Sequence, residues 1–170
     1  MEHQSLRLLT LNMWGVGILW FSKDRVIRMN ALAELLPTLD VDVVALQEIW
    51  MPEAQDRIIQ ATAQSDLRYA YYFRSGILGG SGLLTLSRYP IIHTMFHEFR
   101  LSTRPERILQ GDYYFGKGIG LARIDTPYGE VDIYNLHTIA QYTDDERDGY
   151  IAHRGSNLYE SARFINANST

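Results

Sequence analysis

The order of apolar patterns along the chain is the feature that most constrains its fold. Short runs rich in leucine and β-branched residues alternate at first with longer segments in which apolar residues recur every three or four positions. Two strand–helix pairs come first, several strand-like runs follow, and one helical segment ends the chain. This order predicts a layered α/β domain with mixed sheets, rather than one doubly wound parallel sheet.

These patterns also predict where the elements lie. Strands are predicted at residues 6–11, 41–46, 69–73, 83–87, 91–99, 118–124 and 131–137. Helices are predicted from a cap at Ser22 to a stop at Pro37, over 52–63 and over 144–166. One face of the last helix is expected to be buried, formed by Ile151, Leu158, Ala162 and Ile165.

Composition limits the classes of function. With 170 residues, 46% of them apolar, the chain is expected to form one globular domain. The absence of cysteine excludes disulfides, thiolate catalysis and cysteine-bound zinc. A net charge of −4 disfavours a non-specific nucleic-acid binder. No secretory signal and no run of about 18 apolar residues is visible, so a cytoplasmic or peripheral membrane location is expected.

Three predicted strands end in polar residues that suit metal or phosphate chemistry. Asn12 follows the first strand, Glu48 follows the second, and His137 ends a later one. Strand ends at one sheet edge lie close together, so an amide oxygen and a carboxylate there could share a hard cation such as Mg²⁺. Each residue alone also has an ordinary structural reading, because turn asparagines and strand-end glutamates are common.

Other candidate residues have two readings each. Lys117 lies between two glycines and could contact phosphate or point into solvent. Trp50 could offer its ring face to choline or belong to the core. The aromatic pair Trp20 and Phe21 could contact a lipid surface or pack on the first helix. Asn135 is expected on the same strand face as His137.

Five segments stand in the order found in the endonuclease/exonuclease/phosphatase superfamily, and they most resemble neutral sphingomyelinases. A stretch around Asp112 and Lys117 and a late helical stretch at 150–154 also resemble that pattern. The resemblance covers about residues 6–165, but only the N-terminal part of the family domain. The five segments are Leu11–Gly15, Leu46–Trp50, Phe73–Leu83, Ser87–Ile91 and Tyr134–Thr138.

The resemblance implies the N-terminal portion of a four-layer α/β/β/α sandwich of the DNase I-like type. It also implies a Mg²⁺-dependent phosphodiesterase that converts sphingomyelin to ceramide and phosphocholine at a membrane surface. Glu48 would bind the metal, Asn12 would support metal and phosphate, and His137 would donate to a phosphate oxygen. Substrate contacts are expected from Lys117, Asp112, Asn135 and Trp50. A nuclease, an inositol-phosphate phosphatase and a non-catalytic metal- or lipid-binding fragment are the alternatives.

Two family motifs are missing from these residues. The Gly-Asp-x-Asn motif and the final Asp-His pair, which supplies the general base, would both come after residue 170. The chain is therefore expected to be one C-terminally incomplete domain. We also expect this fragment to be inactive by itself, because loss of a positioned base alone costs about 10²- to 10⁴-fold in rate. We also expect one sheet face to lie uncovered and to promote self-association.

Overall fold

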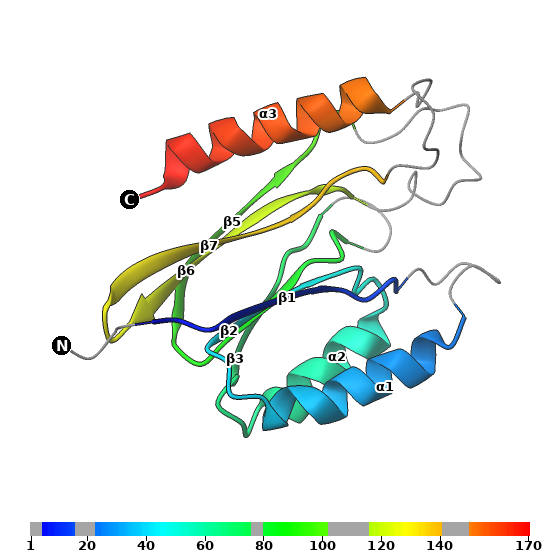
Figure 1. Cartoon of the computed structure of the whole chain (residues 1–170), viewed down its shortest axis with the longest axis vertical. Coiled ribbons are helices and arrows are strands. Elements are labelled where there is room, and N and C mark those ends of the chain that lie inside the picture. Colours follow the sequence, from blue (N-terminus) through cyan, green and yellow to red (C-terminus); the bar gives the residue numbers. More distant parts are fainter. Residues whose placement is uncertain (1–4, 16–22, 76–79, 102–115, 141–149) are drawn as a thin grey trace.

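The fold was analysed on a computed structural model of the chain. The structure describes residues 5–15, 23–75, 80–101, 116–140 and 150–170. Its strands form two sheets that face each other (Figure 1). The first sheet has the order β1-β2-β4-β3, and the second has the order β5-β6-β7.

The first sheet is mixed. It contains β1 (Leu8–Asn12), β2 (Val43–Gln47), β4 (Leu84–Ser87) and β3 (Tyr69–Tyr72). Only the β1–β2 pair is parallel among these pairings; β2–β4 and β3–β4 are antiparallel. The second sheet is antiparallel throughout and contains β5 (Ile91–Glu98), β6 (Gly118–Thr126) and β7 (Gly129–His137).

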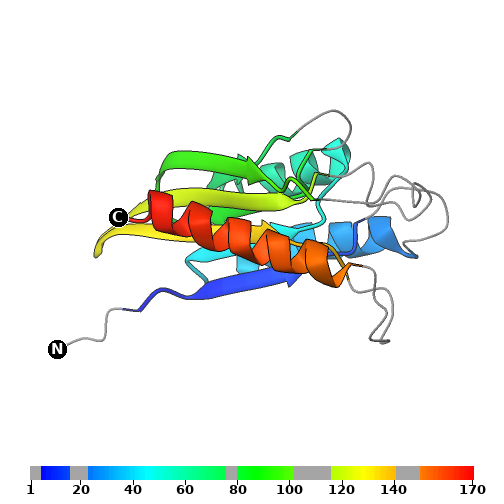
Figure 2. The same ribbon diagram turned by 90° about the horizontal axis from the view of Figure 1, so that it is seen from above.

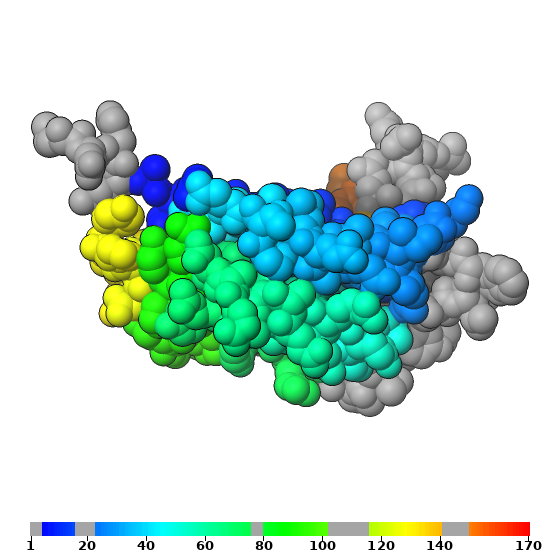
Figure 3. Space-filling view, turned by 90° about the horizontal axis from the view of Figure 1, so that it is seen from below, coloured from blue at the N-terminus to red at the C-terminus, as the bar shows by residue number. Residues whose placement is uncertain are grey.

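Helices cover the outer face of each sheet. The helices α1 (Arg25–Leu35) and α2 (Pro52–Thr62) pack on the first sheet, and α3 (Ile151–Asn168) lies along the second (Figures 1 and 2). Figure 3 shows α1 and α2 side by side on the outer surface of their layer. The predicted four-layer α/β/β/α arrangement is therefore confirmed.

Apolar burial explains this layering. The strand β2 is buried along Val43 to Leu46, which is why its sequence is a continuous apolar run rather than an alternating one. Its neighbours in the core include Leu32 of α1, Ile58 of α2 and Leu84 of β4. Fully burying such a side chain contributes about 1.5–3 kcal/mol, so this cluster fixes both helices on the sheet.

The first helix differs from the prediction at its start. It begins at Arg25 after Asp24, whose backbone has φ 56°, and not directly after Ser22, which lies outside the described residues. Its end agrees with the predicted stop at Pro37, because α1 ends at Leu35 and a 3₁₀ turn, Leu36–Thr38, follows it. Proline is tolerated there because the first turn of a helix does not use its backbone N–H.

The predicted apolar face of the last helix is wrong. The start predicted at residue 144 lies outside the described residues; Ile151 is 67% exposed and Leu158 is 60% exposed. The helix instead buries Asn157 and Ser161. Asn157 donates to the Leu101 carbonyl at 3.0 Å, and Phe164 stacks on His97, so the inward face of α3 carries polar and aromatic side chains.

The expectation of an uncovered sheet face is mostly wrong. The chain supplies strands to both sheets, and β7 of the second sheet packs against β2 of the first, so the inner faces are mostly covered. Exposed apolar side chains remain on more than one strand: Leu8 and Leu11 of β1 are 55% and 39% exposed, and Ile92 of β5 is 50% exposed.

Candidate functional site

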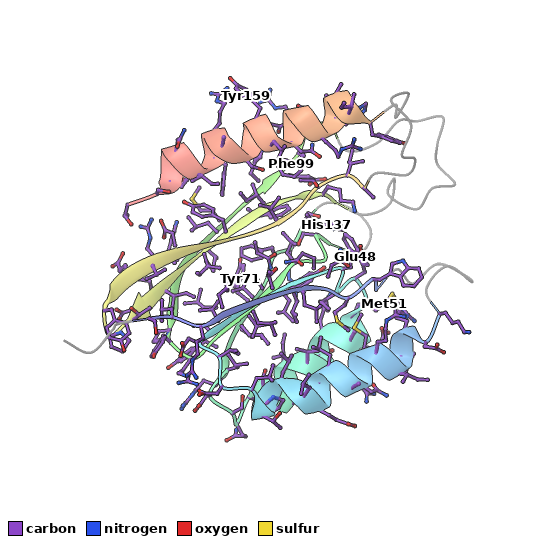
Figure 4. All side chains as sticks on the ribbon, in the orientation of Figure 1. Glu48, Met51, Tyr71, Phe99, His137 and Tyr159 are labelled. Carbon is purple, nitrogen blue, oxygen red and sulfur yellow. The ribbon has the colours of Figure 1, made fainter. Side chains whose placement is uncertain are left out.

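The ends of β1, β2 and β7 meet at one end of the sandwich, where Glu48 and His137 approach each other (Figure 4). The parallel register pairs Asn12 with Gln47, so Asn12 lies beside the start of the loop that carries Glu48. In the other sheet, His137 pairs with Gly118, directly after Lys117. Two sheets thus bring four of the predicted site residues together.

Glu48 is held in a strained conformation with one carboxylate oxygen unused. Its backbone has φ 63°, which is uncommon for a residue with a side chain. Oε1 accepts a hydrogen bond from Asn12 Nδ2 at 2.9 Å. Oε2 is buried and has no hydrogen-bond partner in the part of the chain that the structure describes. A buried carboxylate oxygen without a donor is costly, so this atom is suited to a cation.

Asn12 orients this carboxylate. Its Oδ1 accepts a hydrogen bond from the Trp14 backbone N–H at 2.8 Å, which directs Nδ2 toward Glu48. Gly15 closes the same loop: a Cβ at this position would lie only 1.9 Å from the Glu48 carbonyl oxygen. Only glycine permits this close approach of the two backbones.

His137 is neutral at physiological pH. Burial, followed by the charge of Lys117, lowers the pKa of His137 to about 3. Its Nε2 lies 3.5 Å from Glu48 Oε1 and 3.1 Å from Lys117 Nζ. The imidazole therefore sits between a carboxylate and an ammonium group and remains able to exchange hydrogen bonds without carrying charge.

Lys117 and Trp50 form the wall beside His137. Lys117 is buried, and its Nζ lies 5.8 Å from the centre of the Trp50 ring. The Trp50 and His137 ring centres are also 5.8 Å apart. Gly82, with φ 70°, packs so closely that a Cβ there would lie 2.7 Å from the indole. Trp50 is only 2% exposed, so of its two readings the structure favours a core residue over an open ring face for choline.

Asn135 does not reach the site surface. It is 1% exposed, and its side chain is fully occupied by contacts to the first sheet, so the predicted substrate contact is wrong. Its main partner, Gln47, was not singled out from the sequence. The sequence feature that could have identified Gln47 is its position directly before Glu48, at the end of a strand predicted to be buried. Three other candidates, Trp20, Phe21 and Asp112, lie outside the described residues.

The residues present fit a magnesium ion that keeps most of its waters. Mg²⁺ typically takes one or two carboxylates, with waters and substrate phosphate completing the octahedron. Glu48 Oε2 supplies such an oxygen. Within the described ranges there is no cluster of three or more His, Cys, Asp or Glu side chains that could form an all-protein cage. This set suits a phosphate-binding Mg²⁺ site better than a structural metal site.

Comparison with known proteins identifies the family. The sequence profile of the Endonuclease/Exonuclease/phosphatase family matches residues 9–165. The chain belongs to this family. A Drosophila melanogaster protein provisionally named a neutral sphingomyelinase is 39% identical over 162 residues, covering 95% of this chain and 36% of that protein. An inositol phosphosphingolipids phospholipase C of Saccharomyces cerevisiae is 35% identical over 182 residues, covering 95% of this chain and 38% of that protein.

Proteins of known structure share the fold. The beta toxin of Staphylococcus aureus, in a variant crystallised with bound magnesium ions, superposes with a TM-score of 0.75 at 18% identity. The match covers 98% of this chain and 61% of the toxin chain. The DNase I-like fold is therefore confirmed. The chain spans about two fifths of the length of the fly and yeast relatives.

Proposed function

We propose that this family member contributes the metal- and phosphate-binding part of a Mg²⁺-dependent phosphodiesterase that acts on sphingophospholipids. The observation that carries the proposal is the buried, unpartnered Oε2 of Glu48, which lies in the same site as His137 and Lys117. The names of the fly and yeast relatives support a phosphorylated sphingolipid as substrate class.

The chemistry of the ester explains why these groups belong together. A phosphodiester resists attack because its oxygens are anionic; a bound Mg²⁺ would neutralise that charge and polarise the phosphorus centre. Glu48 would hold the ion, and Asn12 would keep the carboxylate aimed at it. Lys117 would add a fixed positive charge, and neutral His137 would donate one directed hydrogen bond to a phosphate oxygen as charge develops.

Activation of the attacking water requires a group that we do not assign. The other described histidines have different surroundings: His93 is exposed on β5, His97 lies 2.8 Å from Glu160 beneath α3, and the ring of His153 packs edge-on against Tyr150. We therefore propose that the 170-residue chain alone binds Mg²⁺ and phosphate but turns over slowly, at least about 100-fold below a site with a positioned base.

The head group is the open part of this proposal. Sphingomyelin carries phosphocholine, whereas the name of the yeast relative specifies an inositol phosphate. Because the Trp50 ring is buried, it gives no preference for choline. Sphingomyelin remains the proposed substrate, and an inositol phosphosphingolipid is the second candidate. We further propose that the substrate is reached at a membrane surface, which the names of the sphingolipid-cleaving relatives support. Among the described residues, no helix combines the length and hydropathy of a transmembrane segment.

Release of the head group from lipid in mixed micelles tests the proposal. Sphingomyelin and an inositol phosphosphingolipid would be compared with and without Mg²⁺, using the wild-type chain, Glu48→Gln and Glu53→Gln. Glu53 is an exposed carboxylate in the first turn of α2 and serves as the matched control. We expect slow Mg²⁺-dependent release that Glu48→Gln abolishes and Glu53→Gln preserves.

Other outcomes are equally informative. Release that persists in Glu48→Gln or in a chelator would refute the proposed metal site. Mg²⁺ binding without any release would favour the non-catalytic alternative. Cleavage of single-stranded DNA at a higher rate than either lipid would favour the nuclease alternative.

A further inference from the structure

A pair of amides, one buried and one partly buried, joins the two sheets beneath the site. Asn135 lies in β7, and its Oδ1 accepts a hydrogen bond from Gln47 Nε2 at the end of β2, with a distance of 2.7 Å. Asn135 Nδ2 donates in the other direction, to the carbonyl oxygens of Leu46 at 3.1 Å and Leu84 at 3.3 Å. One side chain of the second sheet is thus bonded to two strands of the first.

This pair fixes how β7 sits over β2. Asn135 is 1% exposed, and an amide buried without partners would be strongly unfavourable. Its hydrogen bonds are met only in the observed alignment, so a shift of β7 along β2 would leave them unmade. Gly120, opposite Asn135 in β6, lets the Phe73 ring pack close: a Cβ there would lie 2.7 Å from that ring.

The pair lies directly behind the proposed site. Gln47 immediately precedes Glu48, and Asn135 is two residues before His137, on the same face of the strand. Gln47 Nε2 also lies 3.2 Å from Thr10 Oγ1 in β1, two residues before Asn12. The amide pair therefore contacts each of the three strands that carry Asn12, Glu48 and His137.

We infer that Gln47 and Asn135 form an amide clamp, a positioning pair that sets Glu48 and His137 at their working separation across the two sheets. The role in catalysis rests on the proposed function, whereas the positioning itself does not. Neither residue contacts the reacting atoms, so both act only through their neighbours.

Hydrogen exchange measures the clamp independently of metal and substrate. The Met13 and Ile49 amides bracket the site: they donate to Gln47 O at 3.0 Å and to Gly82 O at 2.9 Å. The full chain would be compared with Asn135→Leu, Gln47→Met and the double variant. In these variants we expect the hydrogen-exchange rates of the Met13 and Ile49 amides to rise about 10-fold or more. The exchange rate of the Val44 amide, in the middle of β2, should rise less.

Coupling between the two side chains is the sharpest expectation. If they act as one unit, the double variant should exchange no faster than the faster single variant. Ile58→Val is the matched control, because it removes a buried methyl from α2 and loses stability without touching the clamp. In Ile58→Val, hydrogen exchange should become faster to a similar extent at all backbone amides, with no selective increase at Met13 and Ile49. If Asn135→Leu does not fold, the exchange rates of Gln47→Met test the clamp instead, because Gln47 is only partly buried and its replacement disturbs the core less.

Metal and substrate readouts then connect the clamp to function. Mg²⁺ affinity should fall about 10- to 100-fold in each single variant, as for groups that orient a metal ligand. Where turnover is measurable, kcat should fall while KM is unchanged. Unchanged exchange at Met13 and Ile49, or strictly additive effects in the double variant, would overturn the clamp. A wild-type chain that binds no Mg²⁺ would refute the proposed function, while the exchange rates would still decide the clamp.

Discussion

The contact between Gly15 and Glu48 can be tested with a single methyl group. A Cβ on Gly15 would lie 1.9 Å from the Glu48 carbonyl oxygen and 2.8 Å from the end of the Met29 side chain. Met29 can turn away, but the carbonyl belongs to the backbone. Because a relaxed contact between carbon and oxygen is roughly 3.3 Å, Gly15→Ala must push the two backbones apart by about 1.4 Å.

That displacement sets the expected magnitudes. Overpacking of this kind costs about 1–3 kcal/mol in the free energy of unfolding. A shift of about 1 Å at a catalytic group can reduce the rate about 100-fold. We therefore expect Gly15→Ala to fold with reduced stability and to bind Mg²⁺ at least about 10-fold more weakly. Urea unfolding gives the first quantity, and calorimetric titration gives the second.

A second glycine provides the control. Gly155 lies in α3, and a Cβ there would have no neighbour within 4 Å. Gly155→Ala should therefore raise the free energy of unfolding by about 0.5–1 kcal/mol through helix propensity and leave Mg²⁺ affinity unchanged. If Gly15→Ala instead matched the wild type in both stability and Mg²⁺ affinity, the close packing of this loop on Glu48 would be refuted.

Two further predictions concern acid stability and association. The Arg123 guanidinium, hydrogen-bonded to Asp132 at 2.7 Å, lowers the pKa of that carboxyl below its usual 3.8, so its stabilisation is present above pH 3.8 and lost as pH falls below it. Asp132→Asn should lower the free energy of unfolding at pH 7 by at most about 1 kcal/mol and flatten the acid limb of stability against pH; an unchanged acid limb would contradict this. Leu8 and Leu11 of β1 are exposed, so we expect the chain to self-associate and Leu8→Lys to weaken this association. Sedimentation that shows a wild-type monomer at all concentrations would contradict this prediction.

Much of the fold could be predicted because local patterns and burial agree. The continuous apolar run at β2 predicts a strand covered on both faces, and the structure has it buried between α1, α2 and the second sheet. The approach of Glu48 to His137 was also predictable, since both end strands and strand ends of packed sheets meet at one edge. Their separation was not, because it depends on contacts between residues far apart in sequence.

The remaining features depend on partners that a sequence pattern does not reveal. The helical repeat of apolar residues predicts that Leu158 faces inward, but the buried position is Asn157, which donates a hydrogen bond to the Leu101 carbonyl. An asparagine such as Asn135 is typical of a surface, yet it is buried, and its Oδ1 accepts a hydrogen bond from Gln47, 88 residues away. Trp50 is covered for a similar reason, since Gly82 leaves room for its ring.

Mg²⁺ binding to the wild-type chain and to Glu48→Gln, measured by calorimetric titration, tests the central claim most directly. The buried, unpartnered Oε2 of Glu48 predicts one site in the wild type and at least about 100-fold weaker binding in Glu48→Gln, with Glu53→Gln unchanged. Equal Mg²⁺ affinity in the wild type and Glu48→Gln would contradict the assignment of this carboxylate as the metal ligand.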